Sequence, residues 1–169
     1  HANLPEGVGG ESWNVHGGGF YLMRKYTVAP AELPKELHWF KYEAYFTWIS
    51  GFALLAIIYY WGAESFLMDP NRAAFSPTTA ILTSVGFLAG GWIAYDLLCR
   101  SVVGRNTGAL AIAVFVLVVA VGWGLTQVFN DRAAFLHVGA VIGTIMSANV
   151  FFVIIPNQKK VVALSLIHI

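Results

Sequence analysis

Charged residues are scarce in this chain. Only 11% of its 169 residues are Asp, Glu, Lys or Arg, whereas 57% are hydrophobic. A water-soluble domain has about 25% charged residues, which help to cover its surface. The shortage of charge excludes an ordinary soluble domain and predicts that lipid surrounds much of the protein. The 6 Trp and 7 Tyr residues suit the two interfaces of a bilayer.

Cysteine is almost absent, and the few charges nearly cancel. The single cysteine, Cys99, excludes an internal disulfide and a metal cluster of several cysteines. The sequence has no Cys-x-x-Cys-His motif, so it carries no covalently attached c-type haem. A net charge of +1 gives no indication of a nucleic-acid partner.

The chain contains several long apolar stretches. A helix rises about 1.5 Å per residue, so about 20 apolar residues cross the hydrocarbon core of a bilayer. The sequence therefore predicts an all-α integral membrane protein, with a helical bundle over residues 43–163. Its four transmembrane helices are expected at residues 43–61, 78–99, 109–129 and 133–155.

Residues that begin and end helices flank these stretches. Ser76 followed by Pro77 is typical of an N-cap and the first position of a helix. Asn130 or Asp131 can cap the fourth helix, and Pro156 is expected to end it.

Small residues recur at every fourth position within the predicted spans. This spacing lets helix backbones approach closely in lipid, so it predicts a packed bundle. The residues are Gly86, Gly90 and Ala94, then Ala120 and Gly124, then Gly139, Gly143 and Ser147.

The positive charges gather on one side of the predicted bundle. Of the 10 Lys and Arg residues, all but Arg72 and Arg132 fall in segments 1–42, 100–105 and 159–160. The positive-inside rule makes the side with these segments cytoplasmic. We therefore expect a multi-pass protein of a bacterial inner (cytoplasmic) membrane, with residues 1–42 in the cytoplasm.

Two histidines lie close to the ends of predicted spans. His137, one turn into the fourth span, could bind haem, relay protons or simply hydrogen-bond a neighbouring helix. His38 opens the first span from the other side, where water can satisfy it. The two lie about 25 Å apart by helix rise, so they cannot bind the same iron. A haem at either one would need a second ligand from outside this sequence.

The segment before the first span combines a histidine, three consecutive glycines, aromatic rings and cations. Rings can stack on a planar heterocycle, and cations can neutralise an anion. Glycines permit the close approach of a ligand, although the segment could equally be a flexible loop with positive-inside charges. The residues in question are His16, the rings of Trp13, Phe20 and Tyr21, and the cations Arg24 and Lys25.

Several long strings of residues resemble one family. Together they extend along nearly the whole chain, to about residue 163, and they are similar to the N-terminal membrane domain of the membrane-bound urate oxidase (urate hydroxylase) family. The strings are His16-Gly-Gly-Gly-Phe-Tyr21, Lys25-Tyr26, Val28-Ala-Pro30, Leu37-His-Trp-Phe-Lys-Tyr-Glu-Ala-Tyr45, Trp48-Ile-Ser-Gly-Phe-Ala-Leu-Leu55, Arg132-Ala-Ala-Phe-Leu-His-Val-Gly-Ala140, Ile142-Gly-Thr-Ile-Met146 and Ala148-Asn-Val-Phe-Phe-Val-Ile-Ile-Pro-Asn-Gln158.

The resemblance implies a membrane domain of about eight helices, of which this chain would hold four. It implies oxidation of urate to 5-hydroxyisourate, a step of purine catabolism, with electrons passed to cytochrome c. That cytochrome would be a missing C-terminal domain or a separate partner. The partners expected from it are urate, the lipid bilayer and cytochrome c.

The segment before the first span is the expected urate site. His16 or His38 would act as the base, and Arg24 or Lys25 would hold the urate anion. The purine would stack on Trp13, Phe20 or Tyr21, and His137 would be a haem ligand on the electron path. Two other functions stay open: a haem-containing electron-transfer subunit without urate activity, and a transporter or structural membrane subunit.

The two ends of the sequence are expected to be those of a fragment. His1 stands where a complete chain would have Met. Residues 164–169 match the translation of a common sequencing adapter, which predicts a non-native tail.

Overall fold

The computed structural model describes residues 4–16, 18–28, 41–72 and 75–160. It contains two compact units, one made of His1–His38 with Asn157–Ile169 and the other of Trp39–Pro156. His38 and the expected tail at 164–169 lie outside the described residues.

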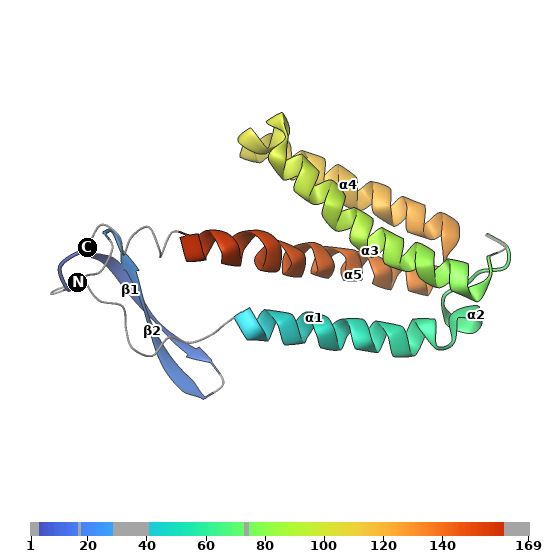
Figure 1. The fold of residues 1–169 in the computed structure, drawn as a ribbon, viewed down its shortest axis with the longest axis horizontal. Coiled ribbons are helices and arrows are strands. Elements are labelled where there is room, and N and C mark those ends of the chain that lie inside the picture. Colours follow the sequence, from blue (N-terminus) through green and yellow to red (C-terminus); the bar gives the residue numbers. More distant parts are fainter. Residues whose placement is uncertain (1–3, 17, 29–40, 73–74, 161–169) are drawn as a thin grey trace. The chain divides into compact units, whose positions relative to one another are not determined.

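A β-hairpin lies within the segment before the first span. Strands β1 (Val8–His16) and β2 (Gly19–Tyr26) pair in antiparallel fashion, with His16 opposite Gly19 at the turn (Figure 1). Gly18 has a φ of 80°, a backbone angle that glycine adopts without strain. The all-α prediction missed this hairpin. Its signal was a pair of glycines between two runs rich in aromatic and β-branched residues.

The remaining described residues are mostly helical, as predicted. Four helices are long and apolar enough to cross a membrane: Tyr42–Tyr60, Pro77–Arg100, Thr107–Val128 and Asp131–Lys160. The elements are α1 (Lys41–Leu55), the π-turn η1 (Ala56–Tyr60), α2 (Ala63–Phe66), α3 (Pro77–Arg100), η2 (Val102–Arg105), α4 (Thr107–Val128), α5 (Asp131–Asn149) and the π-turn η3 (Val150–Ile154).

Side-chain caps set where the spans begin. The Ser76 hydroxyl accepts a hydrogen bond from the Thr79 N–H, with Pro77 at the first position of α3. The Asn130 side chain accepts from the Ala133 N–H and caps α5 in the same way. Both caps confirm the sequence prediction. Asn106 caps α4 through the N–H groups of Gly108 and Ala109, a cap that the sequence analysis did not include.

Pro156 does not end the last helix, contrary to the prediction. The chain continues as helix to Lys160. The π-turn η3 immediately precedes the proline, and within it the backbone hydrogen bonds run five residues back, as from Ile155 to Val150. This wider turn makes room for the ring and offsets the hydrogen bond that proline cannot donate.

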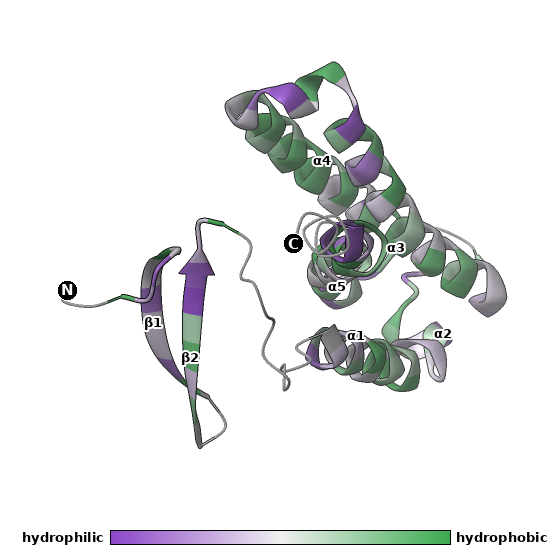
Figure 2. Cartoon of the chain, turned by 60° about the vertical axis from the view of Figure 1, so that its left-hand side comes forward, coloured by the Kyte–Doolittle hydropathy of each residue, from purple (hydrophilic) through white to green (hydrophobic). Residues whose placement is uncertain are grey.

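Helix α5 lies at the centre of the bundle. It contacts α1, α3 and α4, and it lies between α1 and α3 (Figures 1 and 2). Hydrophobic residues cover α4 along its length, and only 6% of its most apolar stretch is buried inside the chain (Figure 2). Such a surface suits lipid or another membrane helix.

Glycines bring the helices together at fewer places than predicted. A Cβ added to Gly91 of α3 would lie 2.5 Å from Val141 Cγ1 of α5, so these two backbones are in close contact. Gly124 of α4 meets the Phe87 ring in a similar way, as its spacing predicted. By contrast, Gly86 and Gly90 face open space, so the predicted close approach at these two positions is wrong.

The buried core lies towards one end of the bundle, which we call the α2 end. Fully buried there are Leu67 after α2, Ala80 of α3, Leu125 and Phe129 around the end of α4, and Ala133 of α5. The backbones of Met68 and Phe129 form an isolated antiparallel bridge, and Asn130 donates from its side-chain amide to the Phe66 carbonyl over 2.7 Å. The loop after the first span is therefore held against the α4–α5 junction.

Arg72 completes this junction. Its guanidinium donates to the carbonyl oxygens of Thr126 and Phe129 at distances of 2.8 and 2.9 Å. It also pairs with the carboxylates of Asp69 and Asp131. The carbonyls at the end of α4 would otherwise lack hydrogen-bond donors, and a cation stabilises the negative end of a helix dipole.

Replacing Arg72 with Ala should lower the free energy of unfolding by about 1–3 kcal/mol, the range for losing a hydrogen bond to a charged group. Arg132→Ala is the matched control, because Arg132 lies at the same end, is exposed and makes no hydrogen bond or ion pair among the described residues. Thermal unfolding of the detergent-solubilised protein measures both. Equal shifts for the two variants would contradict this role of Arg72.

Candidate functional site

A short chain of polar groups crosses the apolar interior near the α2 end. His137 and Ser84 are the two fully buried polar side chains of the described part of the protein. His137 Nε2 lies 2.8 Å from Ser84 Oγ, which in turn lies 2.8 Å from the Tyr60 hydroxyl. His137 Nδ1 lies 2.7 Å from the Ala133 carbonyl oxygen. The chain therefore joins η1, α3 and α5.

When the imidazole of His137 is neutral, the carbonyl of Ala133 determines which group donates and which accepts in each of these hydrogen bonds. A carbonyl oxygen can only accept, so His137 Nδ1 carries the proton and Nε2 is an acceptor. Ser84 must then donate to Nε2, and the Tyr60 hydroxyl donates to Ser84 Oγ. Each of these polar groups thus has a hydrogen-bond partner within the protein, as surroundings of lipid require.

Aromatic rings fix the imidazole from two sides. The Tyr59 ring meets it edge-on, with centroids 5.6 Å apart, and the Phe129 ring lies 5.4 Å away at an angle of 33°. Both rings are themselves almost fully buried. The imidazole is thus held by two hydrogen bonds and two ring contacts.

Haem does not fit at His137 in this arrangement. An iron ligand needs a free ring nitrogen, and both nitrogens are already hydrogen-bonded. The His137 side chain is fully buried and has no exposed surface to offer an iron. Among residues 4–16, 18–28, 41–72 and 75–160, no group of three His, Cys, Asp or Glu residues could hold a metal ion. The geometry of His137 fits the hydrogen-bonding role that the sequence also allowed.

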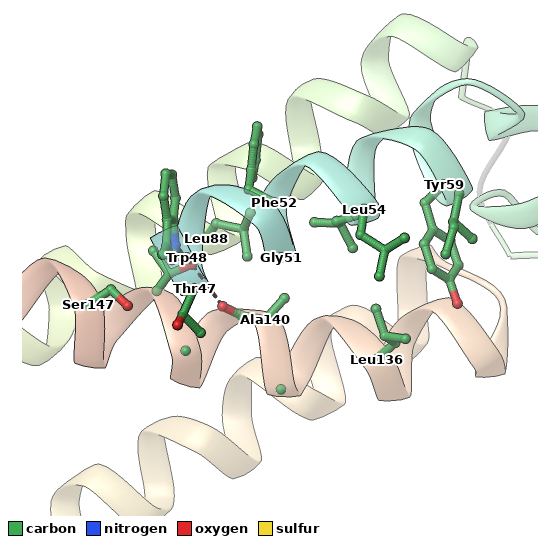
Figure 3. A pocket seen from close by; sticks show the side chains of 15 residues that line it. Thr47, Trp48, Gly51, Phe52, Leu54, Tyr59, Leu88, Leu136, Ala140 and Ser147 are labelled. Carbon is green, nitrogen blue, oxygen red and sulfur yellow. Dashed lines mark hydrogen bonds between the residues drawn. The ribbon is translucent and has the colours of Figure 1, made fainter. Parts of the chain in front are cut away.

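A groove of about 380 Å³ lies between α1 and α5 (Figure 3). One hydrogen bond links the two helices across it, from Trp48 Nε1 to Thr144 Oγ1 over 3.1 Å. The small residues Gly139, Gly143 and Ser147 line the groove, and a Cβ added to either glycine would touch nothing. The predicted close packing therefore does not occur at these glycines within the described chain. The lining is almost wholly apolar, so the groove offers no site for an anion.

The hairpin unit holds most of the residues expected to bind urate, and its register divides them between two faces. Residues directly opposite each other share a face, and the pairs are Glu11 with Arg24, Trp13 with Leu22, and Val15 with Phe20. The expected ring residues Trp13 and Phe20 thus lie on the same face as Arg24. Trp13 is 64% exposed and Phe20 76% exposed, so both rings are open to a ligand.

The other expected residues of the hairpin lie elsewhere. Lys25 follows Arg24 directly and Tyr21 follows Phe20, so both point to the opposite face of the ribbon. His16 pairs with Gly19 at the turn. Arg24 Nε lies 3.4 Å from Glu11 Oε2, which occupies one of the five guanidinium donors and orients the rest.

Ser84→Ala should destabilise the bundle by about 1–3 kcal/mol, because it leaves the buried His137 Nε2 without a donor. Ser147→Ala is the matched control, since the Ser147 hydroxyl makes no hydrogen bond among the described residues. Thermal unfolding in detergent compares the two variants. A Ser84→Ala variant as stable as Ser147→Ala would show that the chain through Ser84 contributes nothing.

Comparison of the sequence with known protein families gives one match. The model of the family described as urate oxidase N-terminal matches residues 1–166, nearly the whole chain. No curated protein and no solved structure gives a significant match. The hairpin and the four apolar helices both fall within the matched range. The chain belongs to the urate oxidase N-terminal family.

Proposed function

We propose that this chain is the membrane domain of a urate oxidase, which converts urate to 5-hydroxyisourate and passes the electrons to cytochrome c. The family match over residues 1–166 is the observation that carries the proposal. The multi-pass helical bundle supports it, because it provides a route between the two sides of a membrane.

The charges at the two ends of the bundle support a cytoplasmic position for the hairpin. Arg100 ends α3 and Arg105 precedes α4, and both lie at the end opposite α2. Arg72 and Arg132 lie at the α2 end. By the positive-inside rule, the end with the arginines after α3 faces the cytoplasm. The first span begins at that same end, so the segment before it would meet urate in the cytoplasm of a bacterial cell.

The reaction sets what the site must provide. Urate and one water give 5-hydroxyisourate, two protons and two electrons, and two ferric cytochrome c molecules take one electron each. A new bond forms between C5 of the purine and the oxygen of water. The protein must hold a planar monoanion, accept a proton from it or from water, and exclude other reactions.

One face of the hairpin supplies the binding chemistry. Trp13 and Phe20 offer exposed rings on which a purine can stack, and Arg24 on the same face supplies the positive charge. The pairing with Glu11 leaves four N–H donors of Arg24 for the ligand. We therefore assign the anion to Arg24 in preference to Lys25, which points to the other face.

The proton acceptor is assigned to an imidazole, that of His16 or His38. The register puts His16 beside the turn on the face of Tyr21 and Lys25, so a purine held on the Arg24 face favours His38 as the base. Since haem does not fit at His137, this residue has no part in the proposed electron path. Electrons would reach cytochrome c on the far side of the membrane from the hairpin.

The proposal is tested with membrane vesicles that carry the protein, supplied with urate and oxidised cytochrome c. We expect urate loss and the reduction of two cytochrome c molecules for each urate. An electron-transfer subunit without urate activity would leave urate unchanged, and a transporter would move it unoxidised; either result refutes the proposal. His16→Gln and His38→Gln variants in the same assay show which imidazole is the base, since only its loss removes the ionisation from the pH–rate profile.

Arg24→Gln should raise the KM for urate about tenfold or more, because it removes a charge-assisted hydrogen bond to the anion. Lys25→Gln is the matched control, with the same change of charge at the next position on the opposite face. We expect the KM of Lys25→Gln to stay within about twofold of the unchanged protein. Steady-state kinetics measures both variants. A larger effect at Lys25 than at Arg24 would overturn the assignment of the binding face.

A further inference from the structure

The groove between α1 and α5 is as long as one leaflet of a bilayer is deep. Its lining begins at Tyr59 and Leu136, near the α2 end, and extends to Thr47 and Ser147 (Figure 3). From Leu136 to Ser147, helix α5 rises about 16 Å. One leaflet contributes about 15 Å of hydrocarbon, which is half of the core of the bilayer. A single acyl chain from the leaflet at the α2 end therefore matches the length of the groove.

One polar group at the end of the groove has no partner. Tyr59 is only 2% exposed, and its hydroxyl makes no hydrogen bond among the described residues. Trp92 Nε1 is the one unpartnered polar atom of these residues that is completely enclosed, so the Tyr59 oxygen keeps some accessible surface. Tyr59 lines the groove, and its hydroxyl points from α1 towards α5 (Figure 3). A molecule in the groove can therefore accept a hydrogen bond from it.

The rest of the lining disfavours water or an ion as the acceptor. None of the described residues that line the groove is charged, so the carboxylate of a free fatty acid would be desolvated without a counter-charge. A hollow with apolar walls also stays dry. A buried hydroxyl without a hydrogen bond costs free energy. The missing acceptor is therefore best supplied by a neutral group on a largely apolar molecule.

The width of the groove admits a hydrocarbon chain but not another helix. Trp48 Nε1 and Thr144 Oγ1 join its two walls over 3.1 Å, whereas a helix with its side chains is about 10–12 Å across. A second copy of this chain, or a further span, cannot enter while this hydrogen bond is present. Gly139 and Gly143 leave the α5 wall without side chains, and a Cβ added to either would touch nothing. The space beside these glycines suits a row of methylene groups.

Tyr59 also lies at a suitable depth for the ester group of a lipid. It is the last residue but one of the span Tyr42–Tyr60, and tyrosines are typical of the boundary between hydrocarbon and headgroups. We propose that the groove binds one acyl chain of a phospholipid from the leaflet at the α2 end. The chain lies against Gly139 and Gly143, and its ester carbonyl oxygen accepts a hydrogen bond from the Tyr59 hydroxyl. This lipid site is separate from the urate face of the hairpin and does not rest on the proposed function.

Binding is measured by titrating the delipidated protein in detergent with dioleoyl phosphatidylcholine and counting the bound lipids by native mass spectrometry. We expect one phospholipid to bind saturably before any others. Gly143→Leu fills the groove with a side chain and should abolish this first binding event. Gly90→Leu, the same change at a glycine of α3 that faces open space outside the groove, should leave it unchanged. No saturable binding, or equal binding by the two variants, would overturn the proposal.

A milder pair of variants tests the hydrogen bond itself. Tyr59→Phe keeps the ring but removes the hydroxyl, so it should weaken binding of the ester lipid about three- to tenfold. Tyr45→Phe is the matched control, because Tyr45 belongs to the same span but does not line the groove, and its affinity should be unchanged.

An ether analogue with the same headgroup and chains lacks the carbonyl groups, and it distinguishes the hydrogen bond from the filling of space. The unchanged protein should bind the ester lipid about three- to tenfold more tightly than the ether lipid, and Tyr59→Phe should bind the two equally. Equal binding of the two lipids by the unchanged protein, or the same preference in Tyr59→Phe, would refute the assignment of the ester carbonyl to Tyr59.

Discussion

Inside a bilayer the hydrophobic effect does not press one apolar helix against another, because lipid tails are as apolar as the side chains. Helices must instead be joined by close packing and by hydrogen bonds that cannot be made to lipid. In this protein such hydrogen bonds are concentrated at the α2 end. There Arg72 donates to the last carbonyls of α4, and Asn130 joins the α4–α5 junction to Phe66 of α2. Near the same end, the hydrogen bonds Tyr60–Ser84–His137 join three spans. These bonds, with the Trp48–Thr144 hydrogen bond and the packing of Gly91 against Val141, join the helices to one another.

The need to satisfy polar groups within the bundle explains the role of His137, which the sequence left open. A histidine within an apolar span could have been a metal ligand, a proton carrier or a structural donor. The geometry favours the last, because the Ala133 carbonyl and the Ser84 hydroxyl use both ring nitrogens and two rings enclose the imidazole. His137 therefore helps to hold three spans together. On the hairpin, by contrast, the exposed rings of Trp13 and Phe20 and the guanidinium of Arg24 remain available to a ligand.

The sequence predicted those features that depend on local chemistry. Span positions followed from length and apolarity, and the caps at Ser76 and Asn130 followed from side-chain type. The sequence did not predict features that depend on which face of a helix or strand contacts a neighbouring element. Gly86 and Gly91 are equally small, yet only Gly91 faces a neighbouring helix, and the π-turn that lets the helix pass Pro156 has no simple local signature. In the hairpin, Arg24 and Lys25 looked interchangeable as anion ligands until the strand register placed them on opposite faces.

Charge ultimately limits where this chain can act on an anion. No charged residue lines the groove between α1 and α5, and the described cations lie on the hairpin or near the ends of the spans. A urate monoanion that entered the bundle would lose its hydration without gaining a partner, at a cost far above what ring stacking returns. An anion site in this chain therefore belongs with the described cations of the hairpin or of the span ends, outside the apolar interior of the bundle.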